Sequence, residues 1–160
     1  MFHLACTRFN NETLAQNLDY KVSHGLNGVI YGTPIKIKQS YSVMVPIFVV
    51  EMNNETNKIE GIGLIKNRLH LDKKYKIYNE NAYNRYIYKG NYWISRTEID
   101  PEIVTMIENM VFKGRSHLKR QSGISVITTK LFLRWNYDEH YIKNMIKDLF
   151  TRKFACDVLE

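Results

Sequence analysis

Short apolar runs separated by turn residues occupy most of the first half of the chain. The two clearest runs, residues 41–51 and 58–66, are rich in Val and Ile and flank a polar turn at residues 53–57. This pattern is typical of a β-hairpin. Gly61 and Gly63 alternate on one face of the second run, where they allow another backbone to come close or the sheet to bend into a barrel.

The other elements of the first half are shorter. Strands are predicted for residues 1–6 and 29–31. Residues 10–17 predict a helix of one or two turns, for which Asn11 is the expected N-cap. Pro46 lies inside the first run of the hairpin and indicates an edge or a bulge there.

The hydrophobic period changes towards the end of the chain. Residues 74–95 still alternate and predict short strands joined by a tight turn at residues 89–91. Asp100 then caps a predicted helix that Gly114 ends. A second helix is predicted for residues 138–153. The apolar face of the first helix contains Ile103, Met106, Ile107 and Met110.

Strands in the first half and helices mostly in the second indicate an α+β protein. A single domain over residues 1–160 is the natural interpretation of this length. We expect a small, curved or barrel-like mixed sheet with helices packed outside, and an open sheet covered on one face is the competing arrangement. No segment is long and apolar enough to cross a membrane, so no membrane partner is expected.

Charge adds a candidate site to this picture. The chain carries a formal net charge of +7, and four of the eight residues from 113 to 120 are Lys or Arg. We call residues 112–124 the basic loop. A dense cationic segment between ordered elements indicates a polyanion, and nucleic acid, whether RNA or DNA, is the expected partner. The alternative is a solvated turn. The candidate binding residues of the loop are Lys113, Arg115, His117, Lys119 and Arg120.

A belt of aromatic and basic residues from 73 to 96 is the second candidate surface. Bases stack on aromatic faces while cations hold the phosphates, and each stacked base contributes about 1–3 kcal/mol. The alternative is that these aromatic residues are ordinary half-buried sheet residues. The candidates for an aromatic pocket that holds a base are Tyr83, Tyr86, Trp93 and Trp135, with Arg85 as a neighbouring cation.

The known catalytic motifs are absent: the chain has no G-x-S-x-G, no Walker loop and no H-E-x-x-H. His117 is a lone histidine without a partner in its loop, so no catalytic residue is assigned. Cys6 and Cys156 lie near opposite ends without a ligand spacing, and neither a disulfide framework, a metal nor a cofactor is expected.

Five segments spread over most of the chain carry a resemblance, at residues 29–34, 48–54, 59–67, 84–90 and 112–124. Together they resemble a family of mostly uncharacterised proteins encoded by large DNA viruses. That resemblance implies an intracellular setting, in the host cytoplasm or nucleus or in association with virions. The strand pair ending in Gly61-Ile62-Gly63 is also similar to PUA-like barrels of the EVE, ASCH and YTH groups, which bind RNA or modified bases in an aromatic-lined pocket. The chain lacks the N-terminal motif of EVE domains, so no pocket residue is transferred.

Three hypotheses follow from these observations. The first is a nucleic-acid-binding domain in which the basic loop holds phosphates and an aromatic pocket holds a base. The second is a nuclease or nucleotide-processing enzyme that uses His117 as acid or base. The third is a virion or scaffold protein whose basic surface faces a genome.

Overall fold

A five-stranded mixed sheet forms the centre of the protein, which the computed structural model describes over all residues 1–160. Its strand order is β6-β4-β3-β1-β7. β1 and β3 are parallel, and every other pair of neighbours is antiparallel. The strands are β1 (His3–Phe9), β3 (Pro46–Asn53), β4 (Lys58–Lys66), β6 (Tyr92–Ser95) and β7 (Ser125–Val126).

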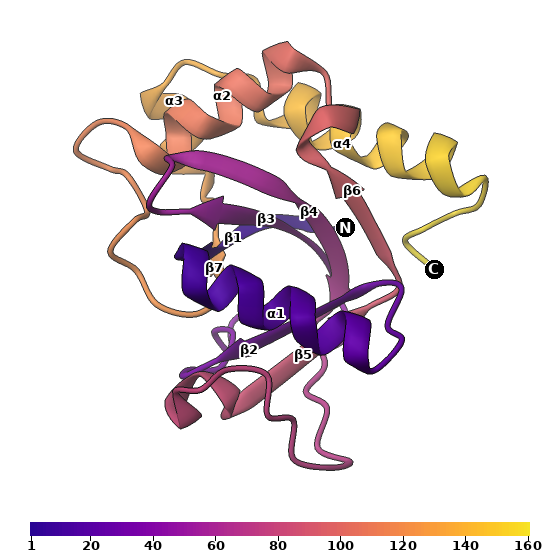
Figure 1. The fold of residues 1–160 in the computed structure, drawn as a ribbon. Coiled ribbons are helices and arrows are strands. Elements are labelled where there is room, and N and C mark those ends of the chain that lie inside the picture. The colour runs from indigo at the N-terminus through magenta and orange to yellow at the C-terminus, as the bar shows by residue number, and fades with distance from the viewer.

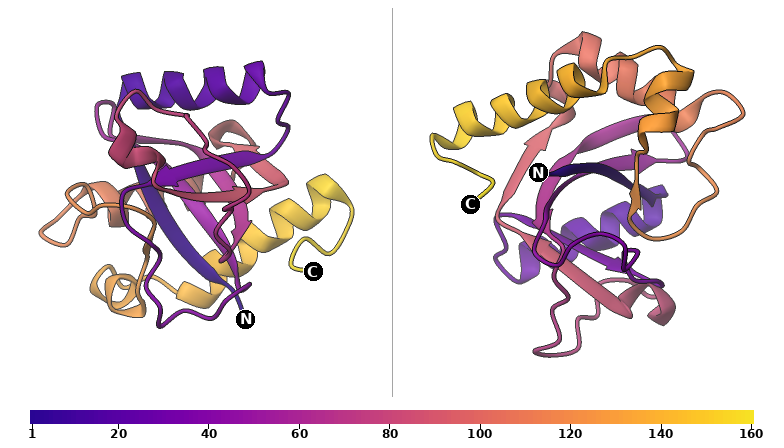
Figure 2. Two further views of the ribbon diagram at one scale, coloured as in Figure 1. Left: turned by 90° about the horizontal axis from the view of Figure 1, so that it is seen from below. Right: turned by 180° about the vertical axis from the view of Figure 1, so that it is seen from behind.

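Both faces of this sheet are covered (Figures 1 and 2). Three helices lie on one face, and a helix with a separate two-stranded sheet lies on the other. The first set is α2 (Pro101–Phe112), α3 (Thr129–Arg134) and α4 (Glu139–Phe154). The second is α1 (Asn11–Ser23) with β2 (Val29–Thr33) and β5 (Tyr86–Gly90), and two short 3-10 helices, η1 (Asn81–Asn84) and η2 (Arg96–Glu98), complete the chain.

Burial on both faces explains the composition of the central strand. Every residue of β3 from Ile47 to Asn53 is buried. A strand between two apolar layers needs a continuous apolar run rather than an alternating one. The Val- and Ile-rich run that predicted the hairpin therefore becomes the strand shared by the two hydrophobic cores.

The hairpin and the two long helices are confirmed. β3 and β4 pair as predicted across the turn at residues 53–57. The Asp100 side chain accepts a hydrogen bond from the Glu102 N–H, and the Asp138 side chain accepts one from the Tyr141 N–H. Each cap satisfies a backbone donor of the first turn that has no partner inside the helix.

The N-terminal helix differs from its prediction. It runs over 13 residues, and its N-cap is Asn10 rather than Asn11. The Asn10 side chain accepts from the Thr13 N–H at 2.8 Å, and Thr13 Oγ1 accepts from the Asn10 N–H at 3.0 Å. This reciprocal capping box selects the earlier residue. The six-residue α3 was not predicted, because so short a helix has almost no periodicity of its own.

The tight turn predicted at residues 89–91 is wrong. β5 and β6 follow each other directly but pair with different strands, β5 with β2 and β6 with β4. The chain passes from one sheet to the other at Gly90. A Cβ atom at Gly90 would lie 1.8 Å from the Leu64 carbonyl oxygen, and one at Gly28 would lie 2.0 Å from the Gly90 oxygen. Three backbones are therefore stacked where no side chain fits.

The architecture confirms the α+β class and the mixed sheet. No barrel closes, because β6 and β7 are edge strands and β5 leaves to pair with β2. The competing arrangement, with one covered face, is also not found, since both faces are covered. None of the helices combines the length and the hydropathy that a membrane span requires.

A buried carboxylate connects the two sheets. Glu51 on β3 is 6% exposed and accepts hydrogen bonds from Tyr31 Oη at 2.6 Å and Trp93 Nε1 at 3.1 Å. A Cβ at Gly63 would lie 2.1 Å from Tyr31 Oη, and one at Gly61 would lie 2.7 Å from the Trp93 ring. The paired glycines on β4 thus allow these two side chains to reach the carboxylate.

Glu51→Gln tests the electrostatics of this network. Burial raises the pKa of the Glu51 carboxyl above its ordinary value, although the hydrogen bonds from Tyr31 and Trp93 oppose the shift. The stability that a raised carboxyl pKa contributes is full below the unfolded pKa near 4.5 and is lost as the pH rises through the folded pKa. The unfolding free energy of the wild type should therefore fall relative to that of Glu51→Gln over this range. Urea denaturation from about pH 4 to about pH 7 measures the difference, and a pH-independent difference contradicts it.

Candidate functional site

Arg8 on β1 holds the basic loop against the sheet. Its guanidinium donates hydrogen bonds to the Leu118 carbonyl at 3.0 Å, to the Gly123 carbonyl, and to Ser125 Oγ at 3.0 Å. One side chain thus ties both ends of the segment from 118 to 125, which lies beside β1 and β7 (Figure 1). Arginine suits this position because its planar group presents several donors in a fixed geometry.

Two further contacts fix the path of the loop. The buried Leu118 donates its N–H to the Val111 carbonyl at 2.8 Å. The Asn54 amide, from the turn between β3 and β4, donates to the Lys119 carbonyl at 3.0 Å. The backbone of the loop is therefore held from three directions, and its charged side chains project from an ordered support.

The basic loop and α3 enclose a hollow of about 330 Å³. Arg115 and His117 of the loop line it together with Lys130 and Arg134 of α3. Arg134 Nη1 donates to Ser116 Oγ at 2.5 Å, which joins the helix to the loop across the hollow. We call this site the basic hollow. No Asp or Glu is among the residues that line it.

The cations of the basic hollow have no ionic partner within the protein. The three salt bridges lie elsewhere, between Arg96 and Glu108, between Lys143 and Glu139, and between Lys153 and Glu98. Arg115, Lys130 and Arg134 are all exposed. Cationic groups gathered around a concave surface without counter-charges attract an external anion, because their fields add there.

His117 has a structural partner in the loop. Its Nδ1 accepts a hydrogen bond from the Lys119 N–H at 3.2 Å. The neutral ring then carries its proton on Nε2, which leaves a donor for a ligand. The other predicted cations do not line the hollow: Lys113 and Arg120 are exposed, and Lys119 is half-buried.

Two predicted aromatic residues lie beside the loop. Trp135 is half-buried next to Gly114, stacks on Tyr137 and lines neither hollow. Tyr83 lines a smaller hollow of about 100 Å³ together with Gln121, Ser122 and Gly123. Its ring is 43% exposed and packs edge-on against Tyr78, with 6.3 Å between the centroids. Gln121 lines both hollows. The Tyr83 hollow and the basic hollow are therefore neighbours along the loop.

Three other predicted residues lie apart from these hollows. Trp93 is bound to the buried Glu51, and its ring is covered by Lys21 Nζ, 5.3 Å from the centroid. Tyr86 is half-buried on β5, with Lys36 Nζ 5.5 Å from its centroid. Arg85 is exposed next to η1. Tyr86 and Trp93 line neither the basic hollow nor the Tyr83 hollow, so the predicted aromatic residues do not form one pocket together.

Sequence reasoning missed Arg8, Lys130 and Arg134. Lys130 and Arg134 are four residues apart, which places them on one face of a helix, and this spacing is a signal that the sequence does contain. For Arg8 there was no local signal, because its partners lie 110 to 117 positions away.

The structure contains no group of three or more His, Cys, Asp or Glu side chains that could hold a metal ion. No protein-family model, no curated protein and no solved structure matches the chain. The resemblances to a viral family and to PUA-like domains therefore stay predictions.

Arg8→Met should loosen the basic loop. The Leu118 and Gly123 carbonyls would lose their donor, and we expect the unfolding free energy to fall by about 1–3 kcal/mol. Hydrogen exchange of residues 118–125 should become faster than in the wild type, as mass spectrometry can measure. Arg152→Met, at an exposed position on α4, is the control. Unchanged exchange in the loop contradicts the assignment of Arg8 as its anchor.

Proposed function

We propose that this protein binds single-stranded nucleic acid along the basic loop, with phosphates in the basic hollow. The observation that carries the proposal is the convergence of Arg115, Lys130 and Arg134 on one hollow that no carboxylate lines. Lys and Arg bind the phosphates of any sequence and release the counterions that surround them. Such a surface can bind RNA as well as DNA.

The rigid attachment of the loop favours binding. A loop that is already ordered loses less conformational entropy when it meets its ligand. The contacts of Arg8 and Asn54 with the loop backbone supply this order, and of the three cations only Arg134 adds to it, through Ser116 Oγ. Arg115 and Lys130 thus remain available for phosphate oxygens, and the Arg134 guanidinium has further N–H donors.

Tyr83 supports a single strand rather than a duplex as the ligand. A volume of about 100 Å³ is below the range of about 300–1,000 Å³ that is usual for ligand pockets. A base would therefore stack on the exposed face of Tyr83 rather than enter an enclosed pocket. Gln121, between the two hollows, lies where the connecting nucleotide would pass. Only an unpaired strand has bases that are free to stack in this way.

The PUA-like pocket, the intracellular setting and the viral family are also part of this proposal. A PUA-like pocket would need the aromatic residues to meet around a base, and Tyr83 is the residue placed to contribute. An intracellular setting and membership of a viral family are part of the same proposal, and both would agree with a nucleic-acid ligand. The enzyme alternative needs a group that orients His117, and the residues lining the basic hollow include no carboxylate for that role.

The double variant Lys130→Gln, Arg134→Gln tests the proposal. Binding of a labelled single-stranded oligonucleotide of about ten nucleotides is measured by fluorescence anisotropy over a series of salt concentrations. Three phosphate contacts predict a log–log slope of about −2 for the wild type. The variant should bind at least about tenfold more weakly at low salt, and its slope should be smaller by roughly one to two.

Arg152→Gln is the matched control, because it removes an exposed cation far from the hollow and should leave both values unchanged. The proposal is contradicted if the affinity of the wild type does not change with salt concentration, or if the double variant binds with the affinity of the wild type. Gel analysis of the same mixtures also detects cleavage. Turnover that disappears in His117→Ala would favour the nuclease alternative over a binding module.

Tyr83→Ala separates stacking from charge. Removing one stacked base costs about 1–3 kcal/mol, so the affinity for single strands should fall about tenfold with an unchanged salt slope. The affinity for a duplex of the same sequence should not change. Tyr141→Ala, which also removes an exposed tyrosine, is the control. Equal losses for single strands and duplexes would show that Tyr83 acts through the fold instead.

A further inference from the structure

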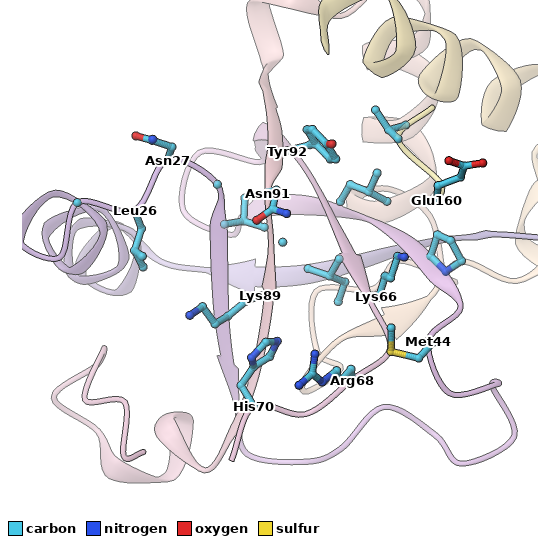
Figure 3. A pocket seen from close by; sticks show the side chains of 18 residues that line it. Leu26, Asn27, Met44, Lys66, Arg68, His70, Lys89, Asn91, Tyr92 and Glu160 are labelled. Carbon is cyan, nitrogen blue, oxygen red and sulfur yellow. The ribbon is translucent and has the colours of Figure 1, made fainter. Parts of the chain in front are cut away.

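A second cavity lies at the opposite edge of the five-stranded sheet. The basic hollow adjoins β7, whereas this cavity lies where β4 ends and where the chain crosses from β5 to β6 (Figure 3). Its volume is about 740 Å³, within the range of about 300–1,000 Å³ of ligand pockets. It shares no lining residue with the basic hollow or the Tyr83 hollow.

One end of the second cavity is cationic. Lys66 is the last residue of β4, Arg68 and His70 lie two and four positions after it, and Lys89 comes from β5. Figure 3 shows Lys89, His70 and Arg68 together at this end. The backbone N–H of His70 donates to the Ile87 carbonyl at 2.9 Å, which fixes this segment against β5. The arrangement therefore depends on ordered backbone rather than on free loops.

These cations have no ion-pair partner, although the Asp72 carboxylate interacts electrostatically with His70 and Lys89. None of the protein's three salt bridges includes them. Glu160 is the one carboxylate residue of the lining, and Figure 3 places it on the far side from Lys89 and His70. Burial, followed by the charges of Lys89 and Arg68, lowers the pKa of His70, while Asp72 opposes this shift. Asp72 itself accepts a hydrogen bond from Tyr75 Oη at 2.6 Å.

The other end of the cavity has a different chemistry. Leu26 and Tyr92 provide apolar and aromatic surface, and the side chain of Asn91 provides an amide donor and acceptor. Apolar and aromatic surface suits the face of a purine or pyrimidine, and an amide suits its edge. Cationic groups suit phosphate oxygens. The two ends together match a molecule with a base at one end and phosphate at the other.

We propose that the second cavity binds a nucleoside phosphate, with the phosphate at Lys66, Arg68, His70 and Lys89 and the base beside Tyr92 and Asn91. This ligand is a free nucleotide rather than part of the strand bound by the basic loop. The size of the cavity supports this choice, because a volume of about 740 Å³ holds both ends of a mononucleotide in one place. The site is independent of the proposed function.

Isothermal titration calorimetry with ADP, GDP, pyrophosphate and adenosine tests the proposal. ADP or GDP should bind saturably, pyrophosphate more weakly, and adenosine should give no measurable binding. Arg68→Gln and Lys89→Met should each weaken nucleotide binding about tenfold, because each removes a charge-assisted contact. Nuclear magnetic resonance of the His70 ring should show its pKa rising when ADP is added, because a phosphate favours the charged imidazole.

Lys130→Gln, Arg134→Gln is the reciprocal control, since it should leave ADP binding unchanged. Circular dichroism checks the fold, and the exposed Arg68 keeps the test informative if Lys89→Met is unstable. Absence of saturable binding, or full binding by both variants, overturns the proposal. So does a loss of oligonucleotide affinity in Arg68→Gln without any ADP binding, because the cavity would then belong to the strand's path. If the protein binds ADP but no oligonucleotide, only the proposed function is refuted.

Discussion

The close stacking of three backbones holds the two sheets of this protein together. Gly28 lies on Gly90, and Gly90 lies on the Leu64 carbonyl, at distances that exclude any side chain. This contact allows one continuous segment to serve β5 in one sheet and β6 in the other. It also brings β2 close enough for Tyr31 to reach the buried Glu51. An unpaired carboxylate at that depth would be costly, so the hydrogen bonds and the glycine contacts support each other.

The two edges of the central sheet have different roles as a consequence. β7 is only two residues long and pairs with β1 at Ala5 and Cys6. Beyond this pairing, Arg8 on β1 holds the basic loop. At the other edge the crossing at Gly90 leaves a space between β4 and the start of β2, which becomes the second cavity. Both cationic sites therefore lie where regular pairing stops, which is where loops supported by a rigid scaffold commonly carry function.

Charge is distributed so that each site stays available for an external anion. The salt bridges use residues such as Glu98 and Glu108 at the helical side of the protein. The cations of the basic hollow and of the second cavity take part in none of these salt bridges. Their shapes differ, since the basic hollow continues along a loop towards Tyr83, whereas the second cavity is a single space with an apolar end. An extended polyanion suits the first shape, and a small one suits the second.

The sequence alone determined the features that depend on neighbouring residues. The hairpin of β3 and β4, the capped helices after Asp100 and Asp138, the α+β class and the cationic character of the loop are all local in origin. Only the tertiary structure decided which strands β5 and β6 join, because the choice depends on contacts between glycines distant in the chain. It also brought Arg134 to the loop and Arg8 to the Leu118 carbonyl, 110 positions away. Periodicity and caps act over a few residues, whereas a binding site is assembled by packing between segments that the sequence separates.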